Sequence, residues 1–429
     1  MNHIAIPQVR EAVDAVIRVP GSKSLTNRAL LVAALSKGDS LLENALFCED
    51  SNIFSTCLGR LGIPVEAEPA LATFRVTGLN GSIPSREASL FVGIAGTAAR
   101  FITAMLALGE GEYRFDGVPA MRRRPMGELF GVLRDQGCEV HCEENEGCIP
   151  FTIKSKGLGG GHIFLKADQT SQQISALLMI APYAERDTII DIEGEVVSKP
   201  YLEMTCRLMS DSGICVSRKG CNHFRIEAGQ RYRPTQYTIE PDASNASYFF
   251  AAAALTGGRV RVYDLSMASC QGDVRFVELL KAMGCKVSST PTYIEVIGPE
   301  KLRGIDADMN DISDTVPTLA AIAPFAASPV TIRNVEHIRR KETDRITAVT
   351  TELRRMGIAV REFSGGFTVY LGTPAPAEIH TYNDHRMAMA FALAGLRASG
   401  IVITDPACTA KTFPDFFDQF LQMASSGGA

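Results

Sequence analysis

The chain lacks features that would each place it in a particular class of protein. It has no excess of positive charge, since 43 Lys and Arg residues stand against 48 Asp and Glu residues and give a net charge of −5. Binding to a nucleic-acid backbone needs clustered positive charge, so this balance argues against nucleic acid as a partner. No run approaches the roughly 18 consecutive apolar residues of a membrane-spanning helix. Charged residues also interrupt the first twenty positions, so no apolar stretch of signal length is present.

The chain also lacks a disulfide-like framework. Its eleven cysteines are an odd number and are scattered, which favours a reducing compartment, and we expect a cytoplasmic protein. Cys138, His141, Cys142 and Cys148 lie close together, but their spacing matches no common zinc pattern. Alternating strand residues around a turn explain them, and we expect no metal site there.

The length and composition indicate a globular protein with more than one core. Of 429 residues, 46% are apolar and 21% are charged, and a chain of this length normally forms two domains. Because the net charge is negative, any anionic ligand requires cations that are gathered locally. No amphipathic docking stretch stands out, and we expect a monomer.

An internal repeat organises the whole chain. Six segments open with small or polar residues and continue as an Ala/Leu-rich stretch, and their starts are 72, 75, 73, 69 and 72 residues apart. The six openings are GSKSLTNRALL at Gly21, GIAGTAARF at Gly93, DQTSQQISALL at Asp168, PDASNASYFF at Pro241, NDISDTVPTL at Asn310 and YNDHRMAMAF at Tyr382.

A second marker recurs in phase with the first. Helix-like stretches end at a glycine that is followed by a strand-like run, at Gly62, Gly137, Gly213, Gly284 and Gly357. Each unit is therefore expected to have a βαβαββ order. Six units predict an α/β (α+β) protein of two domains with three units each: residues 21–240 form one, and residues 1–20 with 241–429 form the other. The last helix has no strand after it, so counting predicts that its missing strand comes from the N-terminal residues Ile4–Val19.

The openings of the repeats combine helix starts with basic residues. The N-terminus of a helix carries unsatisfied N–H groups and partial positive charge, so it can bind an anion. A capped helix start alone explains most such segments. Basic residues recur at these openings and in nearby turns, however, and their joint placement favours a site for two or more anionic groups. They are Lys23, Arg28, Arg100, Arg386, the run Arg122–Arg124, the segment RRKETDR at Arg339, and Lys411.

Several of these strings resemble the EPSP synthase family in order and spacing, from about Pro20 to about Phe417. They are PGSKSLTNRALLVAAL, AGTAAR, RRRPMG, SQQISALLM, SKPY, PDASNASYF, QGD, RRKETDR, YNDHRMAMAF and DPACTAKTFPDFF. The resemblance implies two domains of three βαβαββ units, an inside-out α/β barrel arrangement with the active site in the interdomain cleft. It implies that phosphoenolpyruvate and 3-phosphoshikimate are joined, phosphate is released, and neither a metal nor an organic cofactor takes part.

The resemblance also implies a set of site residues. Asp314 and Glu342 correspond to the acid/base carboxylates, with Lys23 as a second catalytic candidate. Phosphoenolpyruvate is expected to contact Lys23, Gly96, Arg124, Gln172, Arg345, Arg386 and Lys411. The 3-phosphoshikimate set is Lys23, Ser24, Arg28, Thr170, Ser171, Gln172, Ser198, Tyr201, Asp314, His337 and Lys341.

Other interpretations stay open from the residues alone. Asp314 lies in a helix-start segment and can be a cap, and Glu342 can form an i,i+3 ion pair with Arg345. His385, within NDHR, is expected to orient Arg386 rather than to transfer protons. The rival activities are enolpyruvyl transfer to UDP-N-acetylglucosamine, RNA 3′-phosphate cyclisation and anion binding without catalysis. The first usually needs a reactive Cys in the loop that here reads AMRRRP.

Four positions depart from the usual pattern of the family: Ile94, Phe101, Ala120 and His337. Ile94 and Phe101 flank the AGTA segment next to Gly96, so they change the packing beside the expected phosphoenolpyruvate pocket. Glyphosate, a herbicide, competes in that pocket in many members. We therefore predict that glyphosate inhibits this protein more weakly than it inhibits members with the usual residues, while substrate binding changes less. Inhibition constants measured against phosphoenolpyruvate test this, and ordinary sensitivity contradicts it.

Overall fold

The computed structural model describes residues 2–166 and 171–426. The chain divides into two compact units. Residues 21–239 form the N-terminal unit, and residues 2–20 together with residues from Glu240 onward form the C-terminal unit. Within the described ranges no helix is long and apolar enough to cross a membrane.

The N-terminal unit contains three four-stranded sheets. Their strand orders are β14-β3-β5-β4, β6-β7-β9-β8 and β10-β11-β13-β12. The strands are β3 (Lys37–Glu43), β4 (Val65–Glu68), β5 (Thr73–Leu79), β6 (Glu87–Phe91), β7 (Glu110–Asp116), β8 (Glu139–Cys142), β9 (Phe151–Lys156), β10 (Gly161–Lys166), β11 (Thr188–Glu193), β12 (Val216–Lys219), β13 (His223–Ile226) and β14 (Gln236–Thr238).

The C-terminal unit contains two four-stranded sheets and one of three strands. Their orders are β16-β17-β15-β2, β18-β19-β21-β20 and β1-β23-β22. The strands are β1 (His3–Ala5), β2 (Asp14–Ile17), β15 (Arg259–Tyr263), β16 (Lys286–Ser289), β17 (Tyr293–Ile297), β18 (Asp306–Asp308), β19 (Val330–Arg333), β20 (Val360–Phe363), β21 (Gly366–Val369), β22 (Ala377–Ile379) and β23 (Ile401–Thr404).

One pairing pattern recurs in the four-stranded sheets. In the sheet of β6 to β9, β6 and β7 are parallel, while β9 is antiparallel to both β7 and β8. A parallel pair needs a crossover, and here a helix lies between its strands in the chain. The other four-stranded sheets repeat the pattern, and the three-stranded sheet has the parallel pair β22 and β23 with β1 antiparallel to β23. The predicted fold of six βαβαββ units is confirmed.

Strands from distant parts of the sequence complete three sheets. β14 pairs in parallel with β3, and β2 pairs in parallel with β15. β1 lies antiparallel to β23, with His3 opposite Thr404. The last helix thus gains, from the N-terminal residues, the strand that counting along the sequence predicted.

Each βαβαββ unit contributes a buried inner helix and a more exposed outer helix. The inner helices are the Ala-rich segments, and every residue of α8, α10 and α12 is buried. A helix that is apolar all round belongs in a core, and small side chains let such helices pack closely. The inner helices are α1 (Lys23–Leu35), α3 (Gly96–Leu106), α6 (Ser171–Ile180), α8 (Ala243–Thr256), α10 (Val316–Ile322) and α12 (His385–Gly395).

The outer helices are amphipathic, with one face packed on the core and the other exposed to solvent. Several end at a glycine with a left-handed backbone, as the sequence predicted, for example Gly284 (φ 109°) after α9 and Gly357 (φ 78°) after α11. The outer helices are α2 (Glu49–Arg60), α5 (Gly127–Asp135), α7 (Pro200–Asp211), α9 (Phe276–Ala282), α11 (Arg345–Arg355) and α13 (Phe416–Ser426), and a short helix α4 (Pro119–Arg122) precedes α5.

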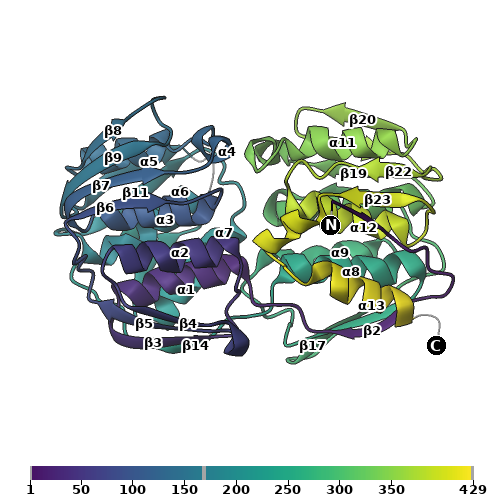
Figure 1. Cartoon of the computed structure of the whole chain (residues 1–429), viewed down its shortest axis with the longest axis horizontal. Coiled ribbons are helices and arrows are strands. Elements are labelled where there is room, and N and C mark those ends of the chain that lie inside the picture. Colours follow the sequence, from purple (N-terminus) through teal and green to yellow (C-terminus); the bar gives the residue numbers. More distant parts are fainter. Residues whose placement is uncertain (1, 167–170, 427–429) are drawn as a thin grey trace. The chain divides into compact units, whose positions relative to one another are not determined.

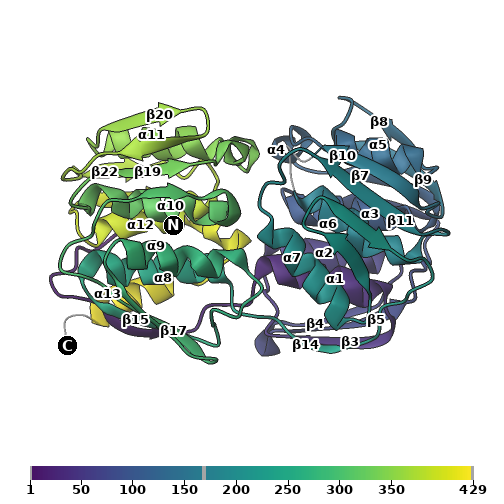
Figure 2. The same cartoon turned by 180° about the vertical axis from the view of Figure 1, so that it is seen from behind.

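In the N-terminal unit and in the C-terminal unit, the three inner helices pack against one another beneath the sheets. Figure 1 shows α1 and α2 lying over the sheet of β3, β4, β5 and β14. Figure 2 shows α8, α10 and α12 inside the C-terminal unit, with β15 and β17 on one side and β19 on the other.

A close approach between β17 and α8 offers a test of this packing. Gly298, directly after β17, lies so near α8 that an added Cβ would overlap the carbonyl oxygen of Ala253. We predict that Gly298→Ala lowers the free energy of unfolding of the C-terminal unit by about 2 kcal/mol, because backbone must move to admit the methyl group. Urea denaturation measures the effect. Gly365→Ala is the matched control, since nothing lies within 4 Å of its added Cβ; equal midpoints for the two variants would contradict the packing argument.

Candidate active site

A buried arginine organises the polar groups of the C-terminal unit. Arg345 is the first residue of α11 and is 1% exposed. Its Nη1 donates to Asp314 Oδ1 at 2.9 Å and its Nη2 to Glu342 Oε2 at 2.9 Å. Its Nε donates to Asp384 Oδ2 at 2.8 Å. One guanidinium thus holds three carboxylates that come from three separate segments.

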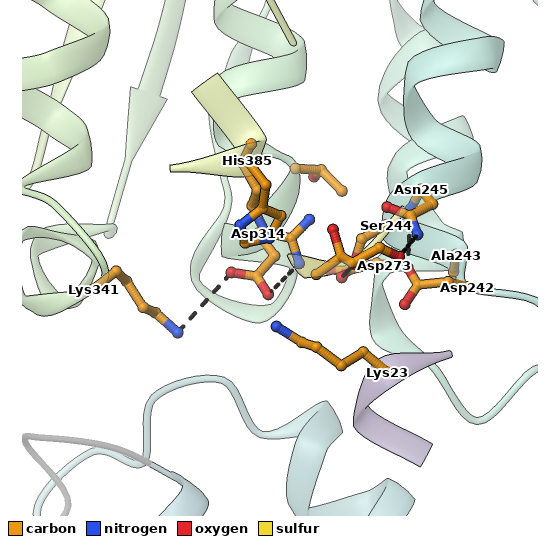
Figure 3. A network of polar contacts seen from close by, with 12 residues as sticks. Lys23, Asp242, Ala243, Ser244, Asn245, Asp273, Asp314, Lys341 and His385 are labelled. Atoms are coloured by element: carbon orange, nitrogen blue, oxygen red, sulfur yellow. Dashed lines mark hydrogen bonds and ion pairs between the residues drawn. The ribbon is translucent and has the colours of Figure 1, made fainter. Parts of the chain in front are cut away.

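Three further cations surround the same carboxylates. Arg386 Nη2 donates to Asp314 Oδ2 at 2.7 Å, and Lys411 Nζ donates to Glu342 Oε1 at 2.9 Å. Lys341 Nζ lies 4.0 Å from Asp314 Oδ1, an ion pair that Figure 3 shows as a dashed line. Arg386 and Lys411 are 6% and 5% exposed. The structure therefore brings together every C-terminal side chain that the sequence nominated for phosphoenolpyruvate, together with both predicted acid/base carboxylates.

Local structure fixes these side chains in place. Asp384 is the N-cap of α12 and accepts a hydrogen bond from Arg386 N at 2.9 Å, while Asp344 caps α11 by accepting from Thr347 N at 3.0 Å. Asp314 lies in a 3-10 turn, η4 (Asn310–Thr315), that leads into α10. Carboxylates at these positions complement the partial positive charge of the helix starts.

The cations control the protonation of Asp314. Burial on its own would raise the pKa of this carboxyl, but Arg386, Lys341 and Arg345 outweigh the burial and hold the pKa well below its ordinary value. Asp314 is therefore ionised at neutral pH. The i,i+3 ion pair between Glu342 and Arg345, one of the interpretations left open from the sequence, is present.

Two histidines lie near this cluster. Burial, reinforced by the charges of Lys341 and Arg345, lowers the pKa of His337 to about 4, so its imidazole is neutral at pH 7. His385 is 1% exposed, and its Nδ1 lies 3.7 Å from Asp384 Oδ1. His385 thus adjoins the carboxylate that holds both Arg345 and the start of α12.

In the N-terminal unit, Arg28 ties three helices together. It is 1% exposed, and its Nε donates to Thr205 Oγ1 at 2.8 Å. Its two Nη atoms donate to the carbonyl oxygens of Ser24 and Tyr201, at 2.9 and 3.2 Å. Its guanidinium also lies over the ring of Phe101, 5.3 Å from the ring centroid. Arg28 therefore fixes Ser24 and Tyr201, two of the residues that the sequence nominated for 3-phosphoshikimate.

A second group in the N-terminal unit gathers at the start of α3. The guanidinium of Arg124 lies against Gly96, where any side chain would overlap it, and Nη1 donates to Ile94 O at 3.5 Å. Arg100 holds the same turn by donating to Gly96 O at 3.0 Å and to Pro125 O at 2.8 Å. Gly96 thus leaves the space next to the backbone that the Arg124 guanidinium occupies.

The remaining nominated residues of this unit lie at or near helix starts. Gln172 Nε2 donates to Thr97 Oγ1 at 3.1 Å, which connects α6 to α3. Lys23 is the first residue of α1, and its Nζ lies 3.6 Å from Asp50 Oδ2. Ser171 begins α6, and Ser198 precedes α7 with a left-handed backbone (φ 55°). Thr170 lies outside the described residues.

Several residues that the structure assigns to these groups were not nominated from the sequence. The sequence could have indicated Asp384, because an acidic residue directly before an Ala-rich helix is a typical N-cap. No sequence pattern indicates Asp50, Ser175 or Thr205, since they contact Lys23 or Arg28 only through tertiary packing. Of the departures from the family pattern, Ile94 contacts Arg124 through its carbonyl, and Phe101 packs on Arg28.

The arrangement suits an enzyme that handles small, multiply charged anions. Each unit presents Lys and Arg side chains at helix starts, and in the C-terminal unit those cations share two carboxylates that can move protons. Together with six βαβαββ units, this defines an enolpyruvyl-transferase-like protein. A model of the family described as EPSP synthase (3-phosphoshikimate 1-carboxyvinyltransferase) matches residues 7–420. The chain belongs to the EPSP synthase family and is a transferase.

Relatives with known names agree with this assignment. The chain is 61% identical over 423 residues to a 3-phosphoshikimate 1-carboxyvinyltransferase of Nostoc punctiforme, covering 99% of each chain. It is 44% identical over 419 residues to the protein of that name from Yersinia pestis, with 96% of each chain covered. A solved EPSP synthase structure from Acinetobacter baumannii has the same fold, with a TM-score of 0.83, 24% identity, and 100% of this chain and 98% of that chain covered. These names do not favour the alternative activity considered from the sequence, enolpyruvyl transfer to UDP-N-acetylglucosamine.

The buried Arg345 cluster generates a stability prediction. We predict that Asp384→Asn lowers the free energy of unfolding of the C-terminal unit by about 3 kcal/mol, because it removes one charge from a fully buried ion pair and leaves Arg345 under-compensated. Denaturant titration followed by circular dichroism measures the loss. Asp306→Asn is the control, since the Asp306–Arg333 pair is exposed and contributes less than about 1 kcal/mol. Similar losses in both variants would contradict this account of the cluster.

Proposed function

We propose that this chain transfers the carboxyvinyl (enolpyruvyl) group of phosphoenolpyruvate to the 5-hydroxyl of 3-phosphoshikimate. The products are 5-enolpyruvylshikimate 3-phosphate and inorganic phosphate. This reaction belongs to the shikimate pathway, which leads through chorismate to the aromatic amino acids. The observation that carries the proposal is the cluster in which Arg345 and Arg386 hold Asp314 while Arg345 and Lys411 hold Glu342.

In the C-terminal unit, phosphoenolpyruvate is held by Arg345, Arg386 and Lys411. Arg386 and Lys411 are already largely removed from water and paired with carboxylates, so an incoming phosphate or carboxylate exchanges one anionic partner for another. Gly96 lets Arg124 approach the backbone turn at the start of α3. The full set is Lys23, Gly96, Arg124, Gln172, Arg345, Arg386 and Lys411.

The 3-phosphoshikimate set is supported by the network around Arg28. Arg28 fixes the backbone of Ser24 and Tyr201, and therefore acts on the acceptor through these residues as well as through its charge. His337 is neutral and offers a hydrogen bond rather than a charge. The full set is Lys23, Ser24, Arg28, Thr170, Ser171, Gln172, Ser198, Tyr201, Asp314, His337 and Lys341.

Asp314 accepts the proton of the 5-hydroxyl. In the structure its pKa is low because cations face it, which makes it a weak base. When the anionic groups of the substrates bind Arg386 and Lys341, part of that positive charge is neutralised and the pKa of Asp314 rises, so the carboxylate becomes a stronger base when it is needed.

Glu342 delivers a proton to the methylene carbon of phosphoenolpyruvate and removes one again during elimination. Its two oxygens are oriented by Arg345 and Lys411, and Lys23 is the second candidate for this step. The reaction is then an addition that gives a tetrahedral adduct, followed by loss of phosphate. Acid–base steps of this type contribute about 10²- to 10⁴-fold, and the rest comes from holding two anions together.

We also infer that the protein is a cytoplasmic monomer. Support for the location is the set of eleven cysteines, which are all free thiols. Size-exclusion chromatography with light scattering tests the oligomeric state, and a mass of twice 46.3 kDa would contradict a monomer.

A phosphate-release assay tests the function directly. Phosphoenolpyruvate is supplied with either 3-phosphoshikimate or UDP-N-acetylglucosamine, and phosphate and the enolpyruvyl product are measured. Turnover with 3-phosphoshikimate alone supports the proposal. Turnover only with the nucleotide sugar, or binding of both substrates without any turnover, contradicts it.

The role of Asp314 gives a sharper prediction. We predict that Asp314→Ala lowers kcat at least about 100-fold while the Kd for 3-phosphoshikimate changes little, because the base is lost and the binding cations remain. Stopped-flow kinetics and isothermal titration calorimetry measure the two quantities. Asp311→Asn is the matched control, since Asp311 lies in the same 3-10 turn and is assigned no role. Near-normal turnover of the Asp314 variant would remove Asp314 from the mechanism.

A further inference from the structure

A second buried carboxyl lies beside Asp314 and has no role in the mechanism above. Asp273 belongs to a 3-10 turn, η3 (Gly272–Arg275), and is 5% exposed. The hydroxyl of Ser244, which is 6% exposed, donates a hydrogen bond to Asp273 Oδ2. Figure 3 shows Asp273 and Ser244 in one polar network with Asp314. A carboxyl buried this deeply needs a structural or chemical reason.

The turn that carries Asp273 is joined to the start of α8. Gln271 Oε1 accepts from Ala243 N at 3.1 Å, and its Nε2 donates to Pro241 O at 2.8 Å. Asp242 is the N-cap of α8 and accepts from Asn245 N at 2.9 Å. Since η3 also packs against η4, which carries Asp314, the side chain of Asp273 has a fixed position between α8 and the Asp314 turn.

Charged groups of α8, η4 and α12 act on Asp273. The start of α8 contributes Asp242, η4 contributes Asp314, and α12 contributes Arg386. On the neighbouring α9, Glu278 forms an exposed ion pair with Arg275. Two carboxylates and one guanidinium therefore act on Asp273, and Arg386 is already hydrogen bonded to Asp314.

These surroundings favour the protonated acid. Burial raises the pKa of Asp273 to about 7; the charges of Asp314 and Asp242 add to the increase, while Arg386 and the hydrogen bond from Ser244 oppose it. Asp314, on the turn packed against that of Asp273, already faces Lys341, Arg345 and Arg386, so an ionised Asp273 adds a second negative charge next to Asp314.

We propose that Asp273 is a positioning residue for the reaction. Asp273 acts through Asp314 and Arg386, and it supports the binding of anionic substrates only while its carboxyl carries a proton. The inference rests on the proposed function, because the substrates must be anions that Arg386 and Lys341 bind. When Asp273 loses its proton, its charge competes with the substrate for Arg386 and repels the anion. Substrate affinity then falls as the pH rises through about 7.

The test compares the pH dependence of the Asp273→Asn variant with that of the unchanged enzyme. Asparagine keeps the shape and can accept the hydrogen bond of Ser244, but it cannot ionise. At pH 6 the two proteins are expected to have KM values for phosphoenolpyruvate within about twofold. Between pH 6 and pH 8.5, the KM of the unchanged enzyme is expected to rise about five- to tenfold more than that of the variant, as one buried charge implies. Ionisation of the substrate itself is common to both proteins and cancels in the comparison.

Ser244→Ala provides a second variant in which the charge remains. Ser244 stabilises the ionised form of Asp273, so its removal is expected to move the rise in KM to a higher pH. Parallel KM profiles in all three proteins would overturn the proposal. So would a loss confined to kcat with no change in the pH dependence of KM, because that is the result of a merely structural role.

An infrared measurement separates this inference from the proposed function. At pH 6 the unchanged protein is expected to show a carbonyl band of a protonated carboxylic acid that disappears as the pH rises to 8.5 and is absent from Asp273→Asn. Absence of that band from the unchanged protein would overturn the inference even in an active enzyme. Presence of the band without turnover of 3-phosphoshikimate would instead contradict the proposed function.

Discussion

The buried guanidinium of Arg345 is the constraint on which the C-terminal site depends. A charge removed from water must be compensated nearby, and the planar fork of arginine can hold several oxygens in fixed directions. Arg345 holds Asp314, Glu342 and Asp384, which come from three separate segments. Because one oxygen of Asp314 faces Arg345, the other is available to Arg386, and the same division applies to Glu342 between Arg345 and Lys411. The orientation of both acid/base carboxylates therefore follows from one buried cation.

The inner helices explain why polar residues collect at particular points. A polar group on a helix that is buried on every side needs a hydrogen-bonding partner, and the ends of the helix supply free backbone groups for that purpose. At those ends the free N–H groups attract carboxylates, as at Asp242 on α8 and Asp384 on α12. In the N-terminal unit the corresponding ends carry Lys23 on α1 and Gly96 on α3. The repeated contrast between a polar opening and an Ala-rich body is thus a consequence of burying one helix in each unit.

Much of the fold was predictable because it repeats. A single Ala-rich stretch indicates only a buried helix, but six at a spacing near 72 residues require a repeated unit, and the strand pairings follow one pattern. The resemblance to the EPSP synthase family nominated Asp314, Glu342, Arg386 and Lys411, which do lie together. The partners of Arg28 were not predictable, since Ser175 and Thr205 meet it only across helix contacts. Asp273 was also missed: the string QGD was noticed for its order in the family, whereas its burial beside Asp314 is visible only in three dimensions.

The path of the chain has a consequence for the order in which a newly synthesised molecule can be completed. The strands of the N-terminal unit, including β14, are all present once residue 239 has left the ribosome. β1 and β2 precede the N-terminal unit in the chain but belong to the C-terminal unit, where they pair with β23 and β15. β2 must wait for the strand at Arg259–Tyr263, and β1 for the strand at Ile401–Thr404. This segment is therefore made before the N-terminal unit but incorporated after it, and the edge of β1 stays unpaired until β23 has been made.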